Sequence, residues 1–327
     1  MKQIIQQLKK SKNVFIASHK NPDGDAIGAL IAMGLALEAI QKNVTCYNEG
    51  PVPAAYRFLP AVNRIVSYSN FKRDYDTAII LDCGNIKRIG KATSLVKTLS
   101  VIINIDHHTT NTNFGHFNFI DVDACASVEI VYKIIKRLNI PISCAMAKAI
   151  YTGIFTDTGS FRFSNTNLDA FKICEEMIGL GVDPYTISKN VYENYSVKRV
   201  KLLNLALDTF ELFYDGMLSM MILTKEMITQ TNTKPEDMEG FINYIKGIKD
   251  VRVAILIQEK QNGRGKLKDK SLYHVSLRSD DTVDVAAIAK VFGGGGHSRA
   301  AGFSAETKLK DLKASIFNLS EKVFMKL

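Results

Sequence analysis

Short apolar runs alternate with longer helical patterns through the first half of the chain. Val14–Ala17, Thr77–Leu81 and Val101–Ile105 are rich in Ile and contain few polar positions, which is typical of strands covered on both faces. Ala26–Gln41 forms an apolar stretch of about four helical turns. Two further helices are expected over Cys125–Leu138 and Pro141–Ile154. This alternation predicts an α/β fold, with a largely parallel sheet and helices on both of its faces.

The second half of the chain predicts a smaller α/β domain that follows a helical connector. The stretch 183–210 has helical spacing and no Gly or Ser runs, so we do not expect a flexible linker there. Strands are expected over Met217–Leu223, Arg252–Gln258 and Tyr273–Arg278, with a solvated turn at Gln261–Lys270. We therefore expect a first domain over residues 1–185, a connector over 186–210 and a second domain over 211–327.

The length of the chain agrees with two domains, and its net charge indicates which classes of partner it could bind. A chain of 327 residues exceeds what one hydrophobic core usually serves. Lys and Arg outnumber Asp and Glu by 42 to 33, a net charge of +9. Such an excess favours anionic partners such as nucleotides or RNA. A lysine-rich surface that only keeps the protein soluble would give the same count, so charge alone leaves both interpretations open.

Cysteine usage and hydropathy indicate a cytoplasmic protein that does not enter a membrane. The five cysteines are scattered and form no Cys-x-x-Cys pair, which argues against a disulfide framework and against a structural zinc site. The N-terminal residues contain no long apolar run, so no signal peptide is expected. No stretch approaches the roughly eighteen consecutive apolar residues of a membrane-spanning helix.

The first candidate site is the segment His19-Lys-Asn-Pro-Asp23-Gly-Asp25. It lies between a predicted strand and a predicted helix, at the edge of an open sheet where ligands bind. Gly24 allows a tight turn, so both carboxylates and the imidazole can face one point. Two carboxylates with one histidine suit Mn²⁺ or Mg²⁺ better than zinc. The alternative is a simple Pro-Asp-Gly turn in which Asp25 caps the helix.

Three further acidic segments follow along the chain. Asp82 comes directly after Thr77–Leu81, and the triplet Asp106-His107-His108 comes directly after Val101–Ile105. Asp157 stands after an apolar helix and before Thr-Gly-Ser. Taken singly, each of these residues is better explained by a loop or capping role than by a functional one. Adjacent histidines point in different directions, so one of the pair could hold a metal while the other reaches a substrate.

These segments indicate a function only when they are taken together. The first three place their acids and histidines at strand ends that share one edge of the predicted sheet, so the side chains can converge. Four carboxylates and two imidazoles exceed the needs of one ion and suit two. A bridging carboxylate would hold two ions roughly 3.5–4 Å apart, the spacing used in phosphoryl chemistry. The sequence therefore predicts a two-metal phosphoester hydrolase with six ligands: His19, Asp23, Asp25, Asp82, His107 and Asp157.

These segments resemble the motifs of the DHH phosphoesterase family, named for the triplet Asp106-His107-His108. The C-terminal sequence GGGGHSRAAGF, which starts at Gly293, is similar to the signature of that family's associated second domain, DHHA1. Size and layout resemble the compact bacterial branch of oligoribonucleases and pAp phosphatases (nano-RNases of the NrnA type). On this resemblance, residues 1–185 are the catalytic DHH domain and residues 211–327 are the substrate-binding DHHA1 domain.

The resemblance also implies a role for each site residue. His19 and Asp23 would hold one metal ion, and Asp82 would bridge to a second. The second ion would be held by Asp25, His107 and Asp157. His108 would contact the scissile phosphate, and Asp106 would orient the neighbouring histidine. The family usually prefers Mn²⁺, with Mg²⁺ or Co²⁺ as alternatives.

Basic and glycine residues supply the candidate phosphate contacts. Consecutive glycines can expose backbone amides as an anion-binding nest, and the alternative is a flexible hinge. We expect this nest, with His297 and Arg299, to grip a substrate phosphate. Arg278 could join the same site, and Arg162 is placed to reach the scissile phosphate, although both could be plain surface arginines. The expected nest consists of Gly293, Gly294, Gly295 and Gly296.

Several substrates remain open at this point. The leading hypothesis is hydrolysis of the 3′,5′-bisphosphate nucleotide pAp to AMP and of very short RNA to mononucleotides. The alternatives are pApA or c-di-AMP as the main substrate, and a non-catalytic sensor of nucleotides or RNA. The complete set of six candidate ligands favours an enzyme, because a pure binder would not need them. No membrane partner is expected, and a homodimer is compatible with the sequence.

Overall fold

The computed structural model describes every residue except 68–73, 194, 261–269, 281 and 325–327. It divides into two compact units, Met1–Asn194 and Tyr195–Leu327. The expected connector, 186–210, spans this boundary, with α7 (Pro184–Tyr192) in the first unit and α8 (Val197–Leu207) in the second. The turn expected at Gln261–Lys270 lies, except for its last residue, outside the described residues.

A six-stranded sheet forms the centre of the first unit. Its strand order is β3-β2-β1-β4-β5-β6, and each pairing between neighbours is parallel. The expected parallel sheet is therefore confirmed. The strands are β1 (Asn13–Ala17), β2 (Asn43–Tyr47), β3 (Ile65–Val66), β4 (Thr77–Leu81), β5 (Val101–Asp106) and β6 (Phe117–Ile120).

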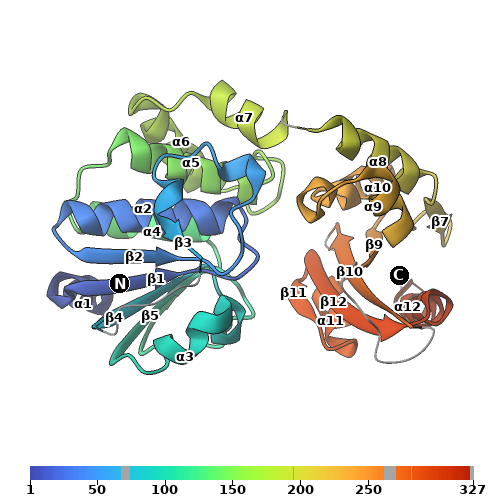
Figure 1. Ribbon diagram of the computed structural model, residues 1–327, viewed down its shortest axis with the longest axis horizontal. Coiled ribbons are helices and arrows are strands. Elements are labelled where there is room, and N and C mark those ends of the chain that lie inside the picture. The colour runs from blue at the N-terminus through green and yellow to red at the C-terminus, as the bar shows by residue number, and fades with distance from the viewer. Residues whose placement is uncertain (68–73, 194, 261–269, 281, 325–327) are drawn as a thin grey trace. The chain divides into compact units, whose positions relative to one another are not determined.

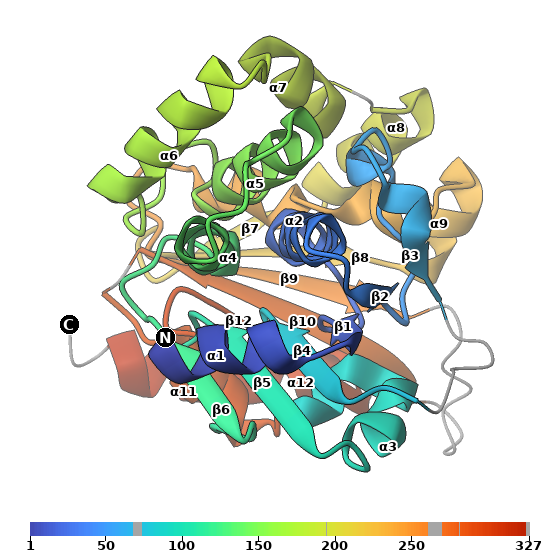
Figure 2. The same ribbon diagram turned by 90° about the vertical axis from the view of Figure 1, so that its left-hand side faces the viewer.

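Helices cover both faces of this sheet, but unequally. On one face, α2 (Gly24–Ala39), α4 (Ser127–Arg137) and α5 (Cys144–Asp157) pack together over the strands (Figure 2). The other face is covered by a 3₁₀ segment, Ile86–Ala92, and the short helix α3 (Thr93–Val96). The remaining helices of the unit are α1 (Lys2–Lys10), α6 (Leu168–Gly179) and two short 3₁₀ turns, Ala54–Tyr56 and Val62–Arg64.

The packing of α2 against α5 depends on small residues. A Cβ atom on Gly28 would lie 2.5 Å from the carbonyl oxygen of Ala149, so only glycine permits this approach of the two helices. Asp25, near the start of α2, and Asp157, at the end of α5, are thereby carried by two helices in close contact. The backbone thus brings two of the expected ligands together before any side chain interaction is considered.

The second unit is built on its own six-stranded sheet, in the order β11-β12-β10-β9-β8-β7 (Figure 1). Only β8 and β9 pair in parallel; the other neighbours are antiparallel. This is the expected smaller α/β domain. The strands are β7 (Glu211–Phe213), β8 (Leu218–Leu223), β9 (Val253–Glu259), β10 (Ser271–Ser279), β11 (Gly295–His297) and β12 (Ala300–Thr307).

Two helical groups pack against this second sheet. One core lies between the strands and the helices α11 (Val285–Val291) and α12 (Leu309–Phe324). A second core joins β8 and β9 to α8, α9 (Lys225–Thr231) and α10 (Phe241–Lys246). A 3₁₀ turn over Pro235–Met238 completes the unit.

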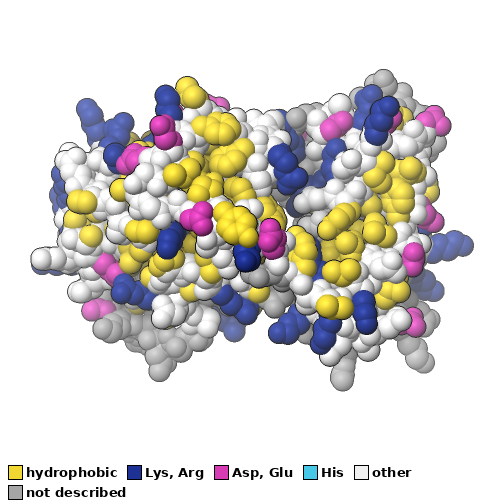
Figure 3. Space-filling view, turned by 90° about the horizontal axis from the view of Figure 1, so that it is seen from above, with side chains coloured by type: hydrophobic (Ala, Val, Ile, Leu, Met, Phe, Trp, Pro, Cys, Tyr) yellow, Lys and Arg dark blue, Asp and Glu magenta, His cyan; other side chains and the backbone are white. Residues whose placement is uncertain are grey.

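One face of the molecule shows how its charged side chains are distributed. On the face drawn in Figure 3, Lys and Arg side chains are scattered over both units and mixed with Asp and Glu, so the basic excess is not gathered there into one patch. Within the described residues, no helix combines the length and the apolar character needed to cross a membrane. All five cysteines are free thiols.

Candidate metal centre

His19 and Asp82 follow two strands that are neighbours in the first sheet. β1 ends at Ala17 and β4 ends at Leu81, and the strand order reverses between them, with β2 and β3 on one side and β5 and β6 on the other. In open parallel sheets, such a reversal opens a crevice at the carboxyl ends of the strands. Here His19 Nε2 lies 3.1 Å from Asp82 Oδ2, and both side chains are buried.

Asp82 occupies a special position in the backbone and in the site. Its φ angle of 51° lies in the left-handed region, which aspartate tolerates better than most residues and which often marks functional sites. Its Oδ2 faces His19, while its Oδ1 lies 3.8 Å from His107 Nε2 and 3.5 Å from His108 Nδ1. The two oxygens of one carboxylate therefore face two different groups of side chains.

The first group consists of His19, Asp23 and Asp82, whose potential ligand atoms all lie within 4.8 Å of one another. Asp23 Oδ2 is 3.8 Å from His19 Nε2, and its Oδ1 accepts a hydrogen bond from the amide of Ala26. Asp23 therefore caps α2, and the alternative that Asp25 caps this helix is wrong. Asp23 is half exposed, so this group opens toward solvent.

The second group consists of Asp25, Asp82 and His107, again with ligand atoms within 4.8 Å of one another. Asp157 joins it, because its Oδ2 lies 3.7 Å from His107 Nε2. Asp157 is the last residue of α5 rather than a residue beyond the helix. His107 Nδ1 lies 3.2 Å from the carbonyl oxygen of Ala124, so an Nδ1–H donor there leaves Nε2 with a lone pair that points at the carboxylates.

Asp25 is fixed by the beginning of α4. Its Oδ2 accepts a 2.6 Å hydrogen bond from the amide of Ser127, and its Oδ1 accepts a 2.8 Å bond from the amide of Val128. Both donors are among the first amides of the helix, which have no partner within the helix and favour negative charge. Each carboxylate oxygen keeps a lone pair after accepting one bond, so Asp25 can still hold a cation.

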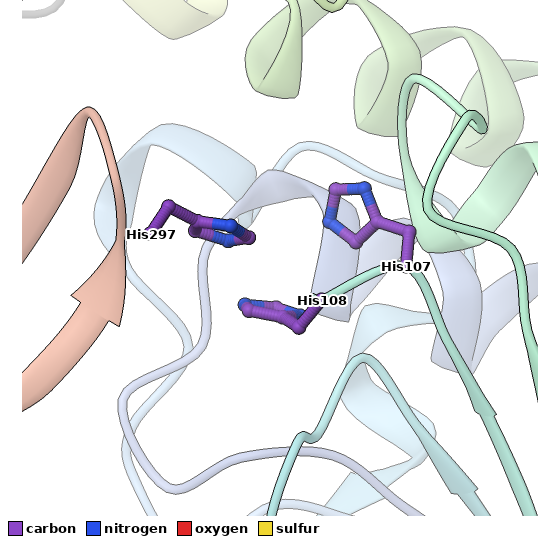
Figure 4. Close-up of side chains that lie close together, drawn as sticks. All are labelled: His107, His108 and His297. Carbon is purple, nitrogen blue, oxygen red and sulfur yellow. The ribbon is translucent and has the colours of Figure 1, made fainter. Parts of the chain in front are cut away.

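His108 is oriented by a separate chain of hydrogen bonds. Its Nδ1 lies 2.7 Å from Asp106 Oδ1, and Asp106 Oδ2 accepts a 2.6 Å hydrogen bond from Asn111. Asn111 also donates to the Oδ1 atom of Asn104, which is fully buried in β5. Figure 4 shows the rings of His107 and His108, which follow β5, in different orientations. Their centroids are 5.0 Å apart and their planes meet at 81°. The two neighbouring histidines therefore point to different targets.

The pKa values of the residues in this centre reflect several buried carboxylates that lie close together. Burial, together with the charges of Asp82 and Asp157, raises the pKa of Asp25 well above its usual value. Burial also raises the pKa of Asp157 to about 7, against the opposing effect of His107. Burial alone would lower the pKa of His107, but the carboxylates of Asp157 and Asp25 raise it to about 9.

Asp82 responds in the opposite direction. Its burial alone would raise the pKa, but the hydrogen bond from His19 and the charges of His108 and His107 hold the pKa well below its usual range. Asp82 therefore stays ionised, whereas the raised pKa values of Asp25 and Asp157 favour their protonated forms. This contrast suits divalent cations, because they would offset the carboxylate charges that the histidines alone do not balance. Oxygen and imidazole donors are also the ligand types that Mn²⁺ accepts.

Arg162 lies on the loop that follows Asp157. Gly159, Ser160 and Phe161 all have φ near 60°, and Arg162 Nε donates a 2.7 Å hydrogen bond to the carbonyl oxygen of Gly159. Left-handed backbone at non-glycine residues is costly and clusters at functional sites. The loop thus anchors the guanidinium at one nitrogen, and among the described residues Arg162 has no acidic partner.

The glycine run of the second unit is a structured hairpin and not a hinge. Gly295, Gly296 and His297 form β11, which pairs with β12; Figure 4 also labels His297 on this strand. The amides of Gly293 and Gly294 donate to the carbonyl oxygens of Lys290 and Ala289 at the end of α11. These two amides are engaged within the fold, so an anion nest would have to use the residues from Gly295 onward.

Arg278 and Arg299 belong to the same region of the second sheet. Arg278 on β10 is paired in register with Ala300 on β12, so it lies next to the hairpin. Its Nη1 donates to the carbonyl oxygen of Leu277, and burial lowers the pKa of its guanidinium. Arg299 lies in the turn of the hairpin, between β11 and β12. The second unit thus gathers Arg278, Arg299 and His297 around one strand pair.

Sequence reasoning missed the residues that hold the expected ligands. Ser127 donates from its amide to Asp25 and from its hydroxyl to Asp82, and Asn165 donates to Asp157. Asn111 holds Asp106. One indication was available for Asn104, which stands inside an apolar run and must be hydrogen-bonded if buried. Ser127 acts across 102 residues on Asp25 and across 45 residues on Asp82, and it leaves no local pattern. Asn111 and Asn165 lie only five and eight positions after the acids that they hold, but an asparagine in a loop gives no sign of its partner.

Comparison with known proteins agrees with this architecture. Residues 13–154 match the model for the DHH family, N-terminal domain, and residues 219–322 match the DHHA1 domain. A bifunctional oligoribonuclease and PAP phosphatase NrnA from Thermus thermophilus is 29% identical over 289 residues, which are 88% of this chain and 83% of that protein. A probable protein of the same name from Streptococcus mutans is 26% identical over 92% of each chain.

A solved structure shows the same fold over nearly the whole chain. The crystal structure of an exopolyphosphatase-related protein from Bacteroides fragilis superposes with a TM-score of 0.87 at 26% identity, and covers 99% of this chain and 95% of that one. The expected DHH and DHHA1 architecture is thereby confirmed. The chain belongs with the proteins that join a DHH family N-terminal domain to a DHHA1 domain.

Proposed function

We propose that this protein is a Mn²⁺-dependent two-metal phosphoesterase that hydrolyses pAp to AMP and very short RNA to mononucleotides. Within this proposal, His19 and Asp23 would hold one ion, and Asp25, His107 and Asp157 would hold the second. Asp82 would serve both ions. Mg²⁺ and Co²⁺ are the alternative metals, because they share the same oxygen and imidazole donors.

The arrangement of Asp82 carries this proposal. Its Oδ2 is 3.1 Å from His19 Nε2 on one side, and its Oδ1 is 3.8 Å from His107 Nε2 on the other. A carboxylate that serves a single ion has no need to face two separate groups of ligands. Two bound ions would supply Lewis-acid activation of the attacking water and neutralise charge on the phosphoryl group.

The side chains around the ligands perform the remaining tasks. If Nδ1 of His108 carries the proton that it shares with Asp106, its Nε2 is set at a fixed orientation and can reach the scissile phosphate or the leaving oxygen. Arg162 is anchored through Nε to Gly159, so its two terminal nitrogens can donate to phosphate oxygens. Both groups act on the substrate and not on the metals.

Substrate binding is assigned to the hairpin of the second unit. Gly295 and Gly296 place no side chain over the backbone, and His297, Arg299 and Arg278 supply donors that suit a nucleotide phosphate. The relatives from Thermus thermophilus and Streptococcus mutans are named for oligoribonuclease and PAP phosphatase activity. Their names support this substrate class for the present chain.

A substrate panel tests the proposal. The protein is incubated with Mn²⁺ and equal concentrations of pAp, the dinucleotide pApA, a short RNA, c-di-AMP or inorganic polyphosphate, and the products are separated. We expect AMP and phosphate from pAp, and mononucleotides from short RNA, with the highest kcat/KM on these two. Dominant turnover of pApA or c-di-AMP, or of polyphosphate, would replace the substrate assignment while keeping the metal centre.

The contrasting outcome separates an enzyme from a sensor. Tight binding of pAp without hydrolysis across Mn²⁺, Mg²⁺ and Co²⁺ would contradict the proposed activity and favour a non-catalytic binder. The matched control is Asp82→Asn, which keeps the shape of the side chain but removes its charge. Activity that is the same in Asp82→Asn and in the unchanged protein would come from a contaminant.

A further inference from the structure

Ser127, the first residue of α4, contacts two of the proposed ligands with two different atoms. Its amide donates a 2.6 Å hydrogen bond to Asp25 Oδ2, and its hydroxyl donates a 3.2 Å bond to Asp82 Oδ1. Asp25 and Asp82 come from different elements, the first turn of α2 and the end of β4. One fully buried serine therefore joins two carboxylates that the chain brings together from far apart.

The hydroxyl contacts a particular oxygen of Asp82. Oδ1 is the oxygen that faces His107, whereas Oδ2 faces His19. Asp25 belongs to the same group as Asp82 and His107. Both hydrogen bonds of Ser127 thus lie on the side of the second group, and neither reaches His19 or Asp23.

The Ser127 hydroxyl is not needed to start the helix. The N-cap residue of α4 is Ala126, whose own side chain makes no capping hydrogen bond. The amides of Ser127 and Val128 are satisfied by Asp25, and the hydroxyl points to Asp82 instead of an amide of its own helix. Its contact is therefore directed at the ligand cluster and not at the stability of α4.

We propose that Ser127 is a positioning residue that sets the spacing of Asp25 and Asp82 and so determines the affinity of the metal site they share with His107. This inference rests on the proposed metal centre. A hydroxyl leaves one lone pair on Asp82 Oδ1 for a cation, and it carries no charge that would repel the ion. Removing such an outer partner typically weakens metal binding 10–100-fold.

The test compares Mn²⁺ binding by Ser127→Ala, Ser127→Thr and the unchanged protein. Free Mn²⁺ is counted by electron paramagnetic resonance during titration of the metal-free full chain. Ser127→Ala keeps the amide bond to Asp25 and removes only the hydroxyl. We expect one of the two ions to bind about 10–100-fold more weakly, the other to bind as before, and Ser127→Thr to regain most of the affinity.

Ser11→Ala is the matched control in the same unit. The Ser11 hydroxyl is also buried and makes two hydrogen bonds, to Gln7 and Thr77, but it lies at the opposite ends of the strands. In EDTA, the melting temperatures of Ser11→Ala and Ser127→Ala should fall by similar amounts. Only Ser127→Ala should then need more Mn²⁺ for activity, with kcat recovering at saturating metal.

Distinct results would overturn this inference. If Ser127→Ala binds both ions as tightly as the unchanged protein, or loses no more affinity than Ser11→Ala, the positioning role is wrong while the metal centre stands. If Ser127→Ala weakens the binding of both ions equally, Ser127 does not act on one site alone. Failure of the unchanged protein to bind Mn²⁺ would overturn the metal centre and this inference together. If Ser127→Ala does not fold, Ser127→Thr decides the question, because it keeps a hydroxyl. A Ser127→Thr protein that binds Mn²⁺ no better than a misfolded chain does would also contradict the proposal.

Discussion

The imidazole of His19 and the carboxylate of Asp82 lie 3.1 Å apart although 63 residues separate them in the chain. The contact exists because β1 and β4 are parallel neighbours that end at the same edge of the sheet. Each residue stands just beyond the end of its strand. The topology therefore assembles the first contact of the proposed metal centre, and the loops only orient the side chains.

Asp82→Asn should abolish most of the activity. The amide cannot supply negative charge to two ions, and its nitrogen would face one of the two groups as a donor. We expect kcat/KM on pAp to fall by more than about 100-fold, which is beyond the loss typical of an outer partner. Steady-state kinetics with Mn²⁺ measures this.

Asp76→Asn is a suitable control for that change. Asp76 precedes β4 at its other end, where its carboxylate accepts hydrogen bonds from the amides of Lys12 and Asn13. This variant should lose some stability but keep its Mn²⁺ affinity and kcat. Equal losses of activity in both variants would show that the effect of Asp82→Asn comes from unfolding.

His108→Ala should separate catalysis from metal binding. The ring of His108 is hydrogen-bonded to Asp106 and is assigned to the substrate. Its loss should lower kcat by about 10²–10⁴-fold, the range for a group that moves a proton or stabilises developing charge. Mn²⁺ titration of the same variant should give nearly unchanged affinities. A strong loss of Mn²⁺ would instead make His108 a ligand.

The glycine hairpin offers two substitutions with opposite expectations. An added Cβ at Gly294 would lie 2.2 Å from the carbonyl oxygen of Gly302 and 2.5 Å from Phe303 Cβ, whereas at Gly295 it would meet nothing within 4 Å. Gly294→Ala should therefore destabilise the protein by at least about 1–3 kcal/mol. Gly295→Ala should leave stability unchanged but raise KM for pAp.

Thermal denaturation and kinetics on the two variants check these expectations. If Gly294→Ala has the same melting temperature as the unchanged protein, the hairpin is not packed as described. If Gly295→Ala leaves KM unchanged, Gly295 does not approach the substrate.

Glu129 should make the first unit sensitive to acid. Its buried carboxylate accepts hydrogen bonds from Lys133, the amide of Cys125 and Asn167. Burial alone would raise the pKa of Glu129, but these partners, Lys133 foremost, lower it below its usual value. A lowered folded-state pKa means that the stabilisation is complete above the unfolded pKa of about 4.3 and is lost as pH falls through the folded value.

Glu129→Gln tests this pH dependence. At pH 7, the variant should be about 1.5–3 kcal/mol less stable, because a charged acceptor is lost. The difference from the unchanged protein should shrink as urea denaturation is repeated at pH 5, 4 and 3. A difference that is constant over this range would contradict the assignment to an ionised Glu129.

The parts of the fold with strong apolar patterns could be predicted from the sequence. Thr77–Leu81 is fully buried and forms β4 with the predicted bounds, and Ala26–Gln41 differs from α2 by only two residues at each end. β2 was missed because Asn43–Tyr47 is largely half-exposed and mixes polar with apolar positions. The short edge strands β3 and β6 lack a long apolar run for the same reason.

The site was predictable in its residue types but not in its details. The acids and histidines stand next to strongly predicted strands, so their convergence followed from the topology. The contact of Ser127 with Asp25 spans 102 residues, and its register depends on how α4 packs against α2. The engagement of the Gly293 and Gly294 amides at the end of α11 likewise depends on where that helix ends, which a run of four glycines does not reveal.

The number of Mn²⁺ ions bound per chain tests the account most directly. Equilibrium titration of the metal-free protein, followed by electron paramagnetic resonance of free Mn²⁺, counts them without requiring a substrate. The two faces of Asp82 predict two ions per chain in the unchanged protein, and weakened binding of both in Asp82→Asn. A single ion per chain, or two ions whose affinities do not respond to Asp82→Asn, would contradict a centre bridged by this carboxylate.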